Sequence, residues 1–270
     1  MPSFADTPSP FSPAPSGASS RDPGAAYSIA PLGVIHSDYP DKFGVPRQPG
    51  LALAANTTLV LTPPFDDPQA VRGLAAFSHL WLTFIFHQTP QVAGRFTPLV
   101  RPPRLGGNQK VGVFASRSPN RPNRLGLSLV ELDRVATAGG TRLVLRGCDL
   151  VDQTPVVDIK PYIPWLEARP DARAGFAPAP PPAVDVVFYP EACAVLARRD
   201  DGASLEALIT QVLRQDPRPA YRHGSPEPRR TYGVRLRDVD VKFQALAPDN
   251  DADAHADKKT ATTLAVVAIE

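Results

Sequence analysis

The stretch VGVFASRSPNRPNRLGLSLVEL, Val111–Leu132, sets two strand-like runs on either side of a stiff turn. The first run, VGVFAS, and the second, LGLSLVELDRV, carry the apolar side chains typical of strands. Between them, serine, proline and asparagine favour a turn for local reasons. The same turn holds Arg117, Arg121 and Arg124, and no acidic residue of the stretch precedes Glu131. Because turns do not need arginine, this positive charge indicates that the turn recognises an anion.

Further strand-like segments flank this stretch in both directions. With the two runs above, they cover residues 27–37, 57–64, 80–88, 111–116, 125–135, 139–151 and 154–164. Residues 80–88 are apolar at nearly every position, which predicts a strand buried on both faces. Residues 66–79 predict a short helix, because Asp67 can cap it and Pro68 suits its first turn. Many short strands with little helix between them indicate a mainly β domain, either a barrel or a sandwich.

The second part of the chain predicts a small α+β domain at 184–270, joined to a barrel domain at 27–168 by a proline-rich linker at 169–183. Its expected strands are 184–190, 231–246 and 262–270, its expected helices are 190–200 and 204–216, and a polar loop covers 249–259. In the longer helix one face is apolar, with Leu205, Leu208, Ile209, Val212 and Leu213. The apolar parity of strand 231–246 switches near Arg237 and Asp238, which predicts a bulge or turn there.

Composition limits the class of protein. The chain has 270 residues and 33 prolines, six of them in residues 1–26, whose lack of large apolar side chains predicts a disordered tail. No apolar run approaches the length of about 20 residues that a membrane helix needs. The two cysteines, Cys148 and Cys193, form no metal-type cluster, so a reduced, cytoplasmic protein without a metal site is expected.

The net charge of +2 hides a strong segregation of charge. No Asp or Glu occurs from Pro68 to Val130, although this span contains eight cationic residues: Arg72, Arg95, Arg101, Arg104, Lys110, Arg117, Arg121 and Arg124. A second basic stretch holds Arg214, Arg218, Arg222, Arg229, Arg230, Arg235 and Arg237. Segregation of this kind suggests a polyanionic partner, although acids elsewhere on the surface could also balance it.

Several familiar sites are absent from the sequence. There is no phosphate loop, no dinucleotide-binding glycine fingerprint and no nucleophile elbow. Instead, arginine, glutamine and aspartate gather in loops at strand ends, beside prolines: VPRQPG, FHQTP, FASRSPNRPN and CDLVDQTPVVDIKPY. Such rigid loops predict a site for a ligand with carboxylate, amide and ribose groups.

The ordered motifs KFGVPRQPGL, AFSHLWLTFIFHQT, VRPPRLGGN, GVFASRSPNRPN, DLVDQTPVVDIKPYIP and DPRPAY together resemble the TsaA-like (YaeB) family of S-adenosylmethionine-dependent tRNA methyltransferases. The resemblance covers about Ile29 to Phe243. It implies a single-sheet β-barrel methyltransferase domain, a homodimer, S-adenosylmethionine as cofactor and tRNA as partner. It further implies methylation of N6 of N6-threonylcarbamoyladenosine at position 37, just 3′ of the anticodon.

The resemblance also implies roles for particular residues. Those expected at the cofactor are Pro46, Arg47, Gln48, His87, Gln88, Arg117, Leu127, Asp149, Asp152, Gln153 and Thr154. Those expected at the tRNA are Arg121, Arg124, Lys160, Arg218, Tyr221 and Arg222. Arg47 or Arg117 would pair with the methionine carboxylate, and Asp152 would hold the ribose or the ammonium. The candidates for a general base are Asp152 and His87.

Two residues depart from the family pattern. Arg124 replaces a proline in the arginine turn, and Gln153 replaces a glycine. If that glycine position requires a positive φ, Gln153 is strained or the loop is reshaped.

Two other functions fit parts of the sequence. One is a non-catalytic RNA-binding β-barrel module, which would explain the basic segregation but not the Arg, Gln and Asp loops. The other is a small-molecule hydrolase or transferase with Asp152 and His87 as acid and base.

Overall fold

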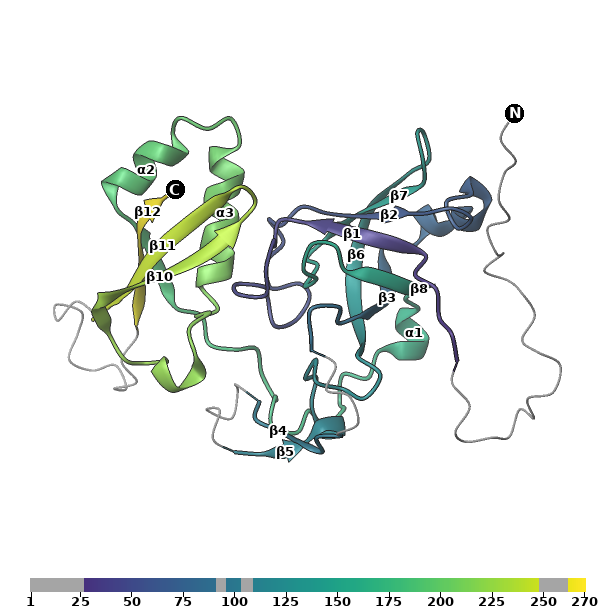
Figure 1. The fold of residues 1–270 in the computed structure, drawn as a ribbon, viewed down its shortest axis with the longest axis horizontal. Coiled ribbons are helices and arrows are strands. Elements are labelled where there is room, and N and C mark those ends of the chain that lie inside the picture. Colours follow the sequence, from purple (N-terminus) through teal and green to yellow (C-terminus); the bar gives the residue numbers. More distant parts are fainter. Residues whose placement is uncertain (1–26, 91–95, 103–108, 248–261) are drawn as a thin grey trace, which may run out of the picture.

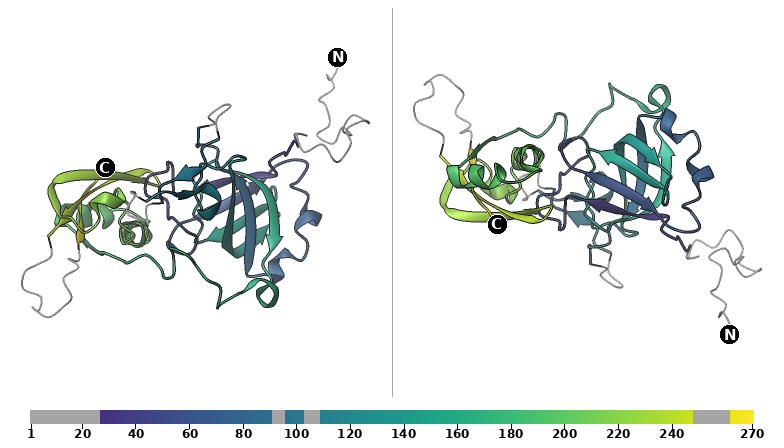
Figure 2. Two further views of the ribbon diagram at one scale, coloured as in Figure 1. Left: turned by 90° about the horizontal axis from the view of Figure 1, so that it is seen from below. Right: turned by 90° about the horizontal axis from the view of Figure 1, so that it is seen from above.

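The computed structural model describes residues 27–90, 96–102, 109–247 and 262–270. The predicted tail at 1–26 and the polar loop at 249–259 lie outside the described residues, as do Arg95 and Arg104. A barrel and a smaller sheet-and-helix domain lie side by side (Figures 1 and 2). In the described part of the chain, no helix combines the length and apolar character needed to cross a membrane.

Six antiparallel strands close into a barrel in the order β1-β2-β7-β6-β3-β8. The strands are β1 (Gly33–Ser37), β2 (Thr57–Leu61), β3 (His79–Ile85), β6 (Leu125–Ala136), β7 (Arg142–Arg146) and β8 (Pro155–Pro161). The predicted mainly β barrel is therefore confirmed. The first strand begins at Gly33, later than expected.

Strand β3 is buried on one face only, so the prediction of two buried faces is wrong. Leu80, Leu82 and Phe84 point into the barrel core, whereas the alternate residues are half-buried. A strand in a closed barrel has one face toward the barrel interior, and no second layer covers the side chains on its outer face. Outside, Trp81 packs edge-on to Tyr162 at 6.1 Å and donates a hydrogen bond to the carboxylate of Glu167 in α1 (Pro164–Glu167).

Two other local predictions need correction. Residues 66–79 form two short 3-10 turns, η1 (Pro68–Val71) and η2 (Leu74–Ala76), rather than one helix, because Gly73 between them has φ 85°. Asp67 caps the first turn as expected, its Oδ1 accepting from the backbone N of Gln69 at 2.8 Å. The run VGVFAS is strand only in β5 (Val111–Gly112), which pairs with β4 (Leu99–Val100), and then turns into η4 (Val113–Ala115).

The C-terminal domain is a sheet of order β10-β11-β12-β9, in which β9 runs parallel to β12. Its elements are β9 (Asp185–Phe188), α2 (Pro190–Leu196), α3 (Gly202–Leu213), η5 (Ala220–Arg222), β10 (Glu227–Leu236), β11 (Val239–Leu246) and β12 (Thr263–Ile269). The predicted apolar face of α3 is buried. The parity switch corresponds to a hairpin turn, with Arg237 in the left-handed region at φ 53°.

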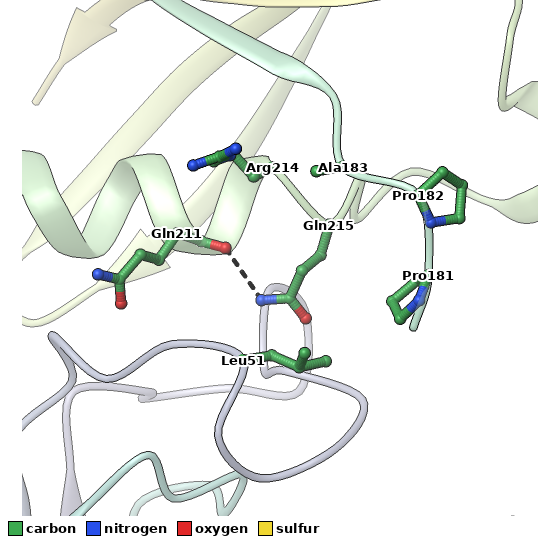
Figure 3. Close-up of a pocket in the computed structure, with 7 residues that line it drawn as sticks. All are labelled: Leu51, Pro181, Pro182, Ala183, Gln211, Arg214 and Gln215. Atoms are coloured by element: carbon green, nitrogen blue, oxygen red, sulfur yellow. Dashed lines mark hydrogen bonds between the residues drawn. The ribbon is translucent and has the colours of Figure 1, made fainter. Parts of the chain in front are cut away.

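The linker reaches the C-terminal domain along the end of α3. Residues 168–184 form no helix or strand, and Val184 donates a backbone hydrogen bond to the carbonyl of Arg214 at 2.9 Å. Figure 3 shows a hollow at this junction, lined by Leu51, Pro181, Pro182, Ala183, Gln211, Arg214 and Gln215. None of the predicted cofactor residues lines this hollow, which lies between the β1–β2 loop, the linker and the end of α3.

Candidate functional site

Four loops named from the sequence converge in the folded chain. Arg117 of the arginine turn donates a hydrogen bond to Oε1 of Gln48, which lies in the β1–β2 loop (residues 38–56). Lys42 of the same loop donates to the carbonyl of Gln88 at 3.0 Å, at the end of β3. The Oγ1 atom of Thr154 lies 3.5 Å from Nδ1 of His87. This contact joins the loop between β7 and β8 to the end of β3. These contacts bring Gln48 to Arg117 and Thr154 to His87, and they tie the β1–β2 loop to the end of β3.

Asp149 is a half-buried carboxylate of this group. Its Oδ1 accepts a hydrogen bond from Oγ of Ser128 at 2.7 Å, and Ser128 itself is 3% exposed. Burial raises the pKa of Asp149 to about 6, against the opposing effects of the Ser128 hydrogen bond and the Arg117 charge. Gln48 is hydrogen-bonded to Arg117, and Arg117 lies near enough to Asp149 for its charge to act on that carboxylate.

Asp152 is already held by its own surroundings. Its Oδ1 accepts from the backbone N of Ser37 at 3.0 Å, and its Oδ2 accepts from Nε2 of Gln153 at 3.2 Å. Its side chain is 33% exposed and lies 3.9 Å from His36. It borders a shallow polar hollow shared with His36 and Asn56. Asp152 can still accept from a ligand there, but it is oriented before any ligand binds.

Gln153 has φ 63°, so this loop keeps the left-handed conformation that suits the glycine of the family pattern. A non-glycine residue in this region costs on the order of 1–3 kcal/mol. The following residue, Thr154, is buried and donates to the carbonyl of Val151 at 2.7 Å. Arg124, the other departure, also has a positive φ, of 52°. Gln153 therefore keeps the loop conformation and carries strain, whereas the φ of Arg124 is one that a proline ring cannot adopt, so the turn is reshaped there.

His87 is the histidine of the group. Burial is the largest effect and lowers its pKa, Asp152 opposes this by raising the pKa, and Lys42 adds a smaller lowering. The ring is therefore neutral at pH 7. Because the Thr154 hydroxyl donates to Val151, it is left to accept from Nδ1 of His87, which leaves the Nε2 lone pair as the acceptor.

The remaining residues expected at the cofactor differ in exposure. Within the β1–β2 loop, Pro46 is buried, while Arg47 is exposed. Leu127 is 55% exposed and follows Gly126 on β6, one residue before the buried Ser128. Leu127 therefore presents an apolar surface outside the barrel wall.

The turn arginines expected at the tRNA lie against backbone carbonyls of the protein. Arg121 donates to the carbonyl of Ser116 at 2.8 Å, and its guanidinium lies 5.9 Å from the ring of Phe114. Arg124 lies 3.4 Å from the carbonyl of Thr89. Both side chains are half-buried, so they stiffen the turn and keep part of the guanidinium at the surface. Lys160, in contrast, is 74% exposed.

The prediction that Arg218 contacts tRNA is wrong, because its side chain is 0% exposed. Its guanidinium forms a two-point pair with Asp216, at 2.7 and 2.8 Å, and donates to the carbonyl of Ser225 at 2.9 Å. In this loop Tyr221 is 69% exposed, whereas Arg222 is half-buried, pairs with Glu227 and lies 5.2 Å from the Tyr221 ring. Arg218 therefore organises the loop that presents them.

Sequence reasoning missed Lys42 and Ser128. Lys42 is the first residue of the motif KFGVPRQPGL. Its contact with the Gln88 carbonyl could not be predicted, because the two residues lie far apart in the chain. Ser128 left a readable signal. It occupies an inward position of β6, between Gly126 and Val130, where a barrel interior favours an apolar side chain.

Two family models match this chain. The tRNA-methyltransferase O N-terminal domain matches residues 34–168, and the TrmO C-terminal domain matches residues 181–253. Together they cover the barrel and most of the C-terminal domain.

Individual relatives agree with these matches. A tRNA (adenine(37)-N6)-methyltransferase of Escherichia coli K12 is 48% identical over 223 residues, which are 82% of this chain and 94% of the relative. A Pseudomonas aeruginosa protein whose name describes an S-adenosylmethionine-dependent methyltransferase is 49% identical over 230 residues, 83% of this chain and 94% of the relative. A crystal structure of TrmO from Pseudomonas aeruginosa matches with a TM-score of 0.69 and 39% identity, over 91% of this chain and 99% of that one. By its two domain matches and these relatives, the chain belongs to the tRNA-methyltransferase O family.

Proposed function

We propose that this protein transfers a methyl group from S-adenosylmethionine to N6 of the adenine at position 37 of tRNA, and that the acceptor already carries the threonylcarbamoyl group. The proposal rests on the convergence of Gln48, Arg117 and Asp149 in a chain whose relatives are named tRNA (adenine(37)-N6)-methyltransferases. An amide, a cation and a carboxylate are the groups that an amino-acid moiety needs for its polar ends.

S-adenosylmethionine supplies a methyl group already activated by its sulfonium, so the chain mainly has to align the acceptor and exclude water. Arg117 binds the methionine carboxylate, and Asp149 faces the ammonium. Asp152, fixed by Ser37 and Gln153, holds the ribose hydroxyls. The raised pKa of Asp149 supports this assignment, because a carboxylate held at some cost in a site favours a bound cation.

His87 takes the proton that leaves the acceptor nitrogen. Its neutral ring, with Nδ1 toward Thr154, leaves Nε2 free to accept. Asp152 is the less suitable of the two candidates, because its carboxylate already accepts from Ser37 and Gln153 and is assigned here to the ribose hydroxyls. Replacement His87→Gln should therefore lower the rate at saturating cofactor more than Asp152→Asn does.

The tRNA binds to exposed cations and to Tyr221. Arg222 and Lys160 contact backbone phosphates, while the exposed parts of Arg121 and Arg124 contact the anticodon loop. Phosphate contacts of this kind position the RNA, and discrimination comes from the splayed-out modified base. Because tRNA is the substrate, we also place the enzyme in the cytoplasm, where the free thiols of Cys148 and Cys193 remain reduced.

A homodimer is part of the proposal. Phe96, Leu99 and Phe114 are 55%, 49% and 70% exposed, and the two phenyl rings stack at 6.1 Å. These residues lie on or beside the β4–β5 pair, outside the barrel (Figure 1). Light scattering should give a dimer for the wild type and a monomer for Phe114→Glu; a monomeric wild type would contradict the dimer.

The deciding experiment is a methylation assay with labelled S-adenosylmethionine and total tRNA from cells that can or cannot make threonylcarbamoyladenosine. Label entering only the first pool supports the proposal. Label in both pools would mean a different acceptor base. A protein that binds tRNA but no cofactor would instead be the non-catalytic RNA-binding module, and activity independent of both ligands would favour the hydrolase or transferase. Arg117→Ala should abolish labelling, whereas Arg146→Ala, on the outer face of the barrel, should not.

A further inference from the structure

The β1–β2 loop, which carries Arg47 and Gln48, is built into the core of the other domain. Tyr39, Ala52 and Ala55, each at most 3% exposed, belong to the hydrophobic cluster formed by α2, α3 and the C-terminal sheet. In Figure 1 this loop reaches from the barrel toward α3 and the β10–β11 hairpin. Its conformation is therefore determined by the C-terminal domain as well as by the barrel.

Contacts of the loop backbone show how closely the β1–β2 loop packs against the C-terminal domain. A Cβ added to Gly44 would lie 2.2 Å from the side chain of Val234 on β10, so only glycine fits there, with φ 90°. Farther along the loop, the backbone N of Ala54 donates to Oε1 of Gln211 on α3 at 2.9 Å. The loop is thus held along its length by both β10 and α3.

One side chain closes the base of the loop. Asp38 joins the two ends, because its Oδ2 accepts from the backbone N of Asn56 at 2.8 Å. Arg237, at the tip of the β10–β11 hairpin, donates through Nε to the same oxygen at 3.1 Å and through its backbone N to the Asp38 carbonyl at 2.9 Å. The Arg237 and Asp38 side chains are 11% and 12% exposed. Removing one partner of a pair so far withdrawn from water is costly, because the other charge is left without compensation.

Arg237 is itself fixed from the opposite side. Its Nη1 donates to Asp201 and to Ser204, both at 2.9 Å, at the start of α3. Arg199 completes the group by pairing with Asp201 at 2.7 Å and with Asp238 at 2.8 Å. The hairpin tip is therefore anchored to α3, and Asp38 receives a guanidinium whose position is set by the C-terminal domain.

The base of the loop leads directly to the proposed site. The residue after Asp38 is Tyr39, whose carbonyl accepts from the backbone N of Asp152 at 2.8 Å. The residue before it is Ser37, whose backbone N donates to the Asp152 carboxylate. A shift at Asp38 would therefore move Asp152 as well as the loop that carries Gln48.

We propose that Arg237 is a positioning residue for cofactor binding: through Asp38 it fixes the β1–β2 loop and Asp152, so that the C-terminal domain sets the affinity of the barrel for S-adenosylmethionine. The positive φ of Arg237 fits this role. Glycine would relieve the strain at that position, but only a guanidinium can bridge Asp38 and Asp201. The effect on affinity rests on the function proposed above, whereas the effect on loop position does not.

Two substitutions separate the side chain from the backbone. Arg237→Gly removes the guanidinium and relieves the left-handed strain, and Arg237→Ala removes the guanidinium and keeps the strain. Arg235→Ala is the matched control, because Arg235 is an exposed arginine on the same strand. Calorimetric titration with S-adenosylmethionine, steady-state kinetics and hydrogen exchange of the loop amides should be measured for all three.

Both Arg237 variants should raise the dissociation constant for S-adenosylmethionine about tenfold, the effect of about 1.4 kcal/mol. Amides of residues 39–55 should exchange faster, while kcat at saturating cofactor stays near that of the wild type. Asp38→Ala should give the same loss, and combining it with Arg237→Gly should add little. The proposal is wrong if loop exchange and affinity match those of Arg235→Ala, or if amides of the whole C-terminal domain exchange faster. If the wild type binds no S-adenosylmethionine, the proposed function fails, and loop exchange alone decides the positioning role.

Discussion

Replacing Asp149 by asparagine tests the electrostatic description of the site most directly. In the unfolded chain an aspartate loses its proton near pH 3.9, whereas in the folded chain the pKa of Asp149 is about 6 because of burial. Between these values the folded state holds more protons than the unfolded state. Raising the pH through this window therefore lowers the free energy of unfolding.

The size of the effect follows from the two pKa values. A difference of about two pKa units lowers the free energy of unfolding by about 3 kcal/mol once Asp149 is ionised. This loss is complete above pH 7 and absent below pH 4. The asparagine side chain would carry no charge, and Ser128 could still donate its hydrogen bond to the amide oxygen. Asp149→Asn should therefore equal the wild type in stability at pH 4 and exceed it by up to about 3 kcal/mol at pH 8.

Urea denaturation of both proteins at each pH from 4 to 8 measures this difference, and the other titrating groups cancel between the two curves. Asp158→Asn is the control, because its side chain is 48% exposed and its pair with Lys160 is long, at 3.7 Å. The same Asp149 variant should bind S-adenosylmethionine about tenfold more weakly, since it loses the partner of the ammonium. A stability difference that does not change with pH would refute the reasoning.

Three further changes test other parts of the structure. Arg121→Ala should weaken tRNA binding and reduce the slope of log K against log salt by about 1, measured by fluorescence titration; an unchanged slope would mean no phosphate contact. Arg218→Met should destabilise the protein by about 3–5 kcal/mol in urea titration, because it leaves Asp216 buried without its partner; a loss below about 1 kcal/mol would contradict that account. Gln153→Gly should raise stability by about 1 kcal/mol in thermal unfolding, because it relieves the left-handed strain, and a lower melting temperature would show that the Gln153 contact with Asp152 matters more.

Much of the local structure could be predicted from the order of residues alone. Alternating side chains identified β6 and β7, and the buried face of α3 followed from its periodicity. The parity switch located the hairpin turn at Arg237 and Asp238. The ordered motifs identified the family, and their loops held the residues that meet at the site. All of these signals are local, because periods of two and 3.6 residues are properties of neighbouring side chains.

Which distant residues share an environment could not be predicted in this way, because it depends on how the folded elements pack. The run LWLTFIFHQ is equally apolar on both faces, and barrel closure decided that only one face is buried. The second basic stretch contains Arg218, Arg222 and Arg237, which look alike in sequence. Folding buries Arg218 against Asp216, leaves Arg222 at the surface and carries Arg237 to Asp38, 199 residues away along the chain. Burial and partner choice depend on how separate elements pack together, and no pattern of neighbouring residues records that packing.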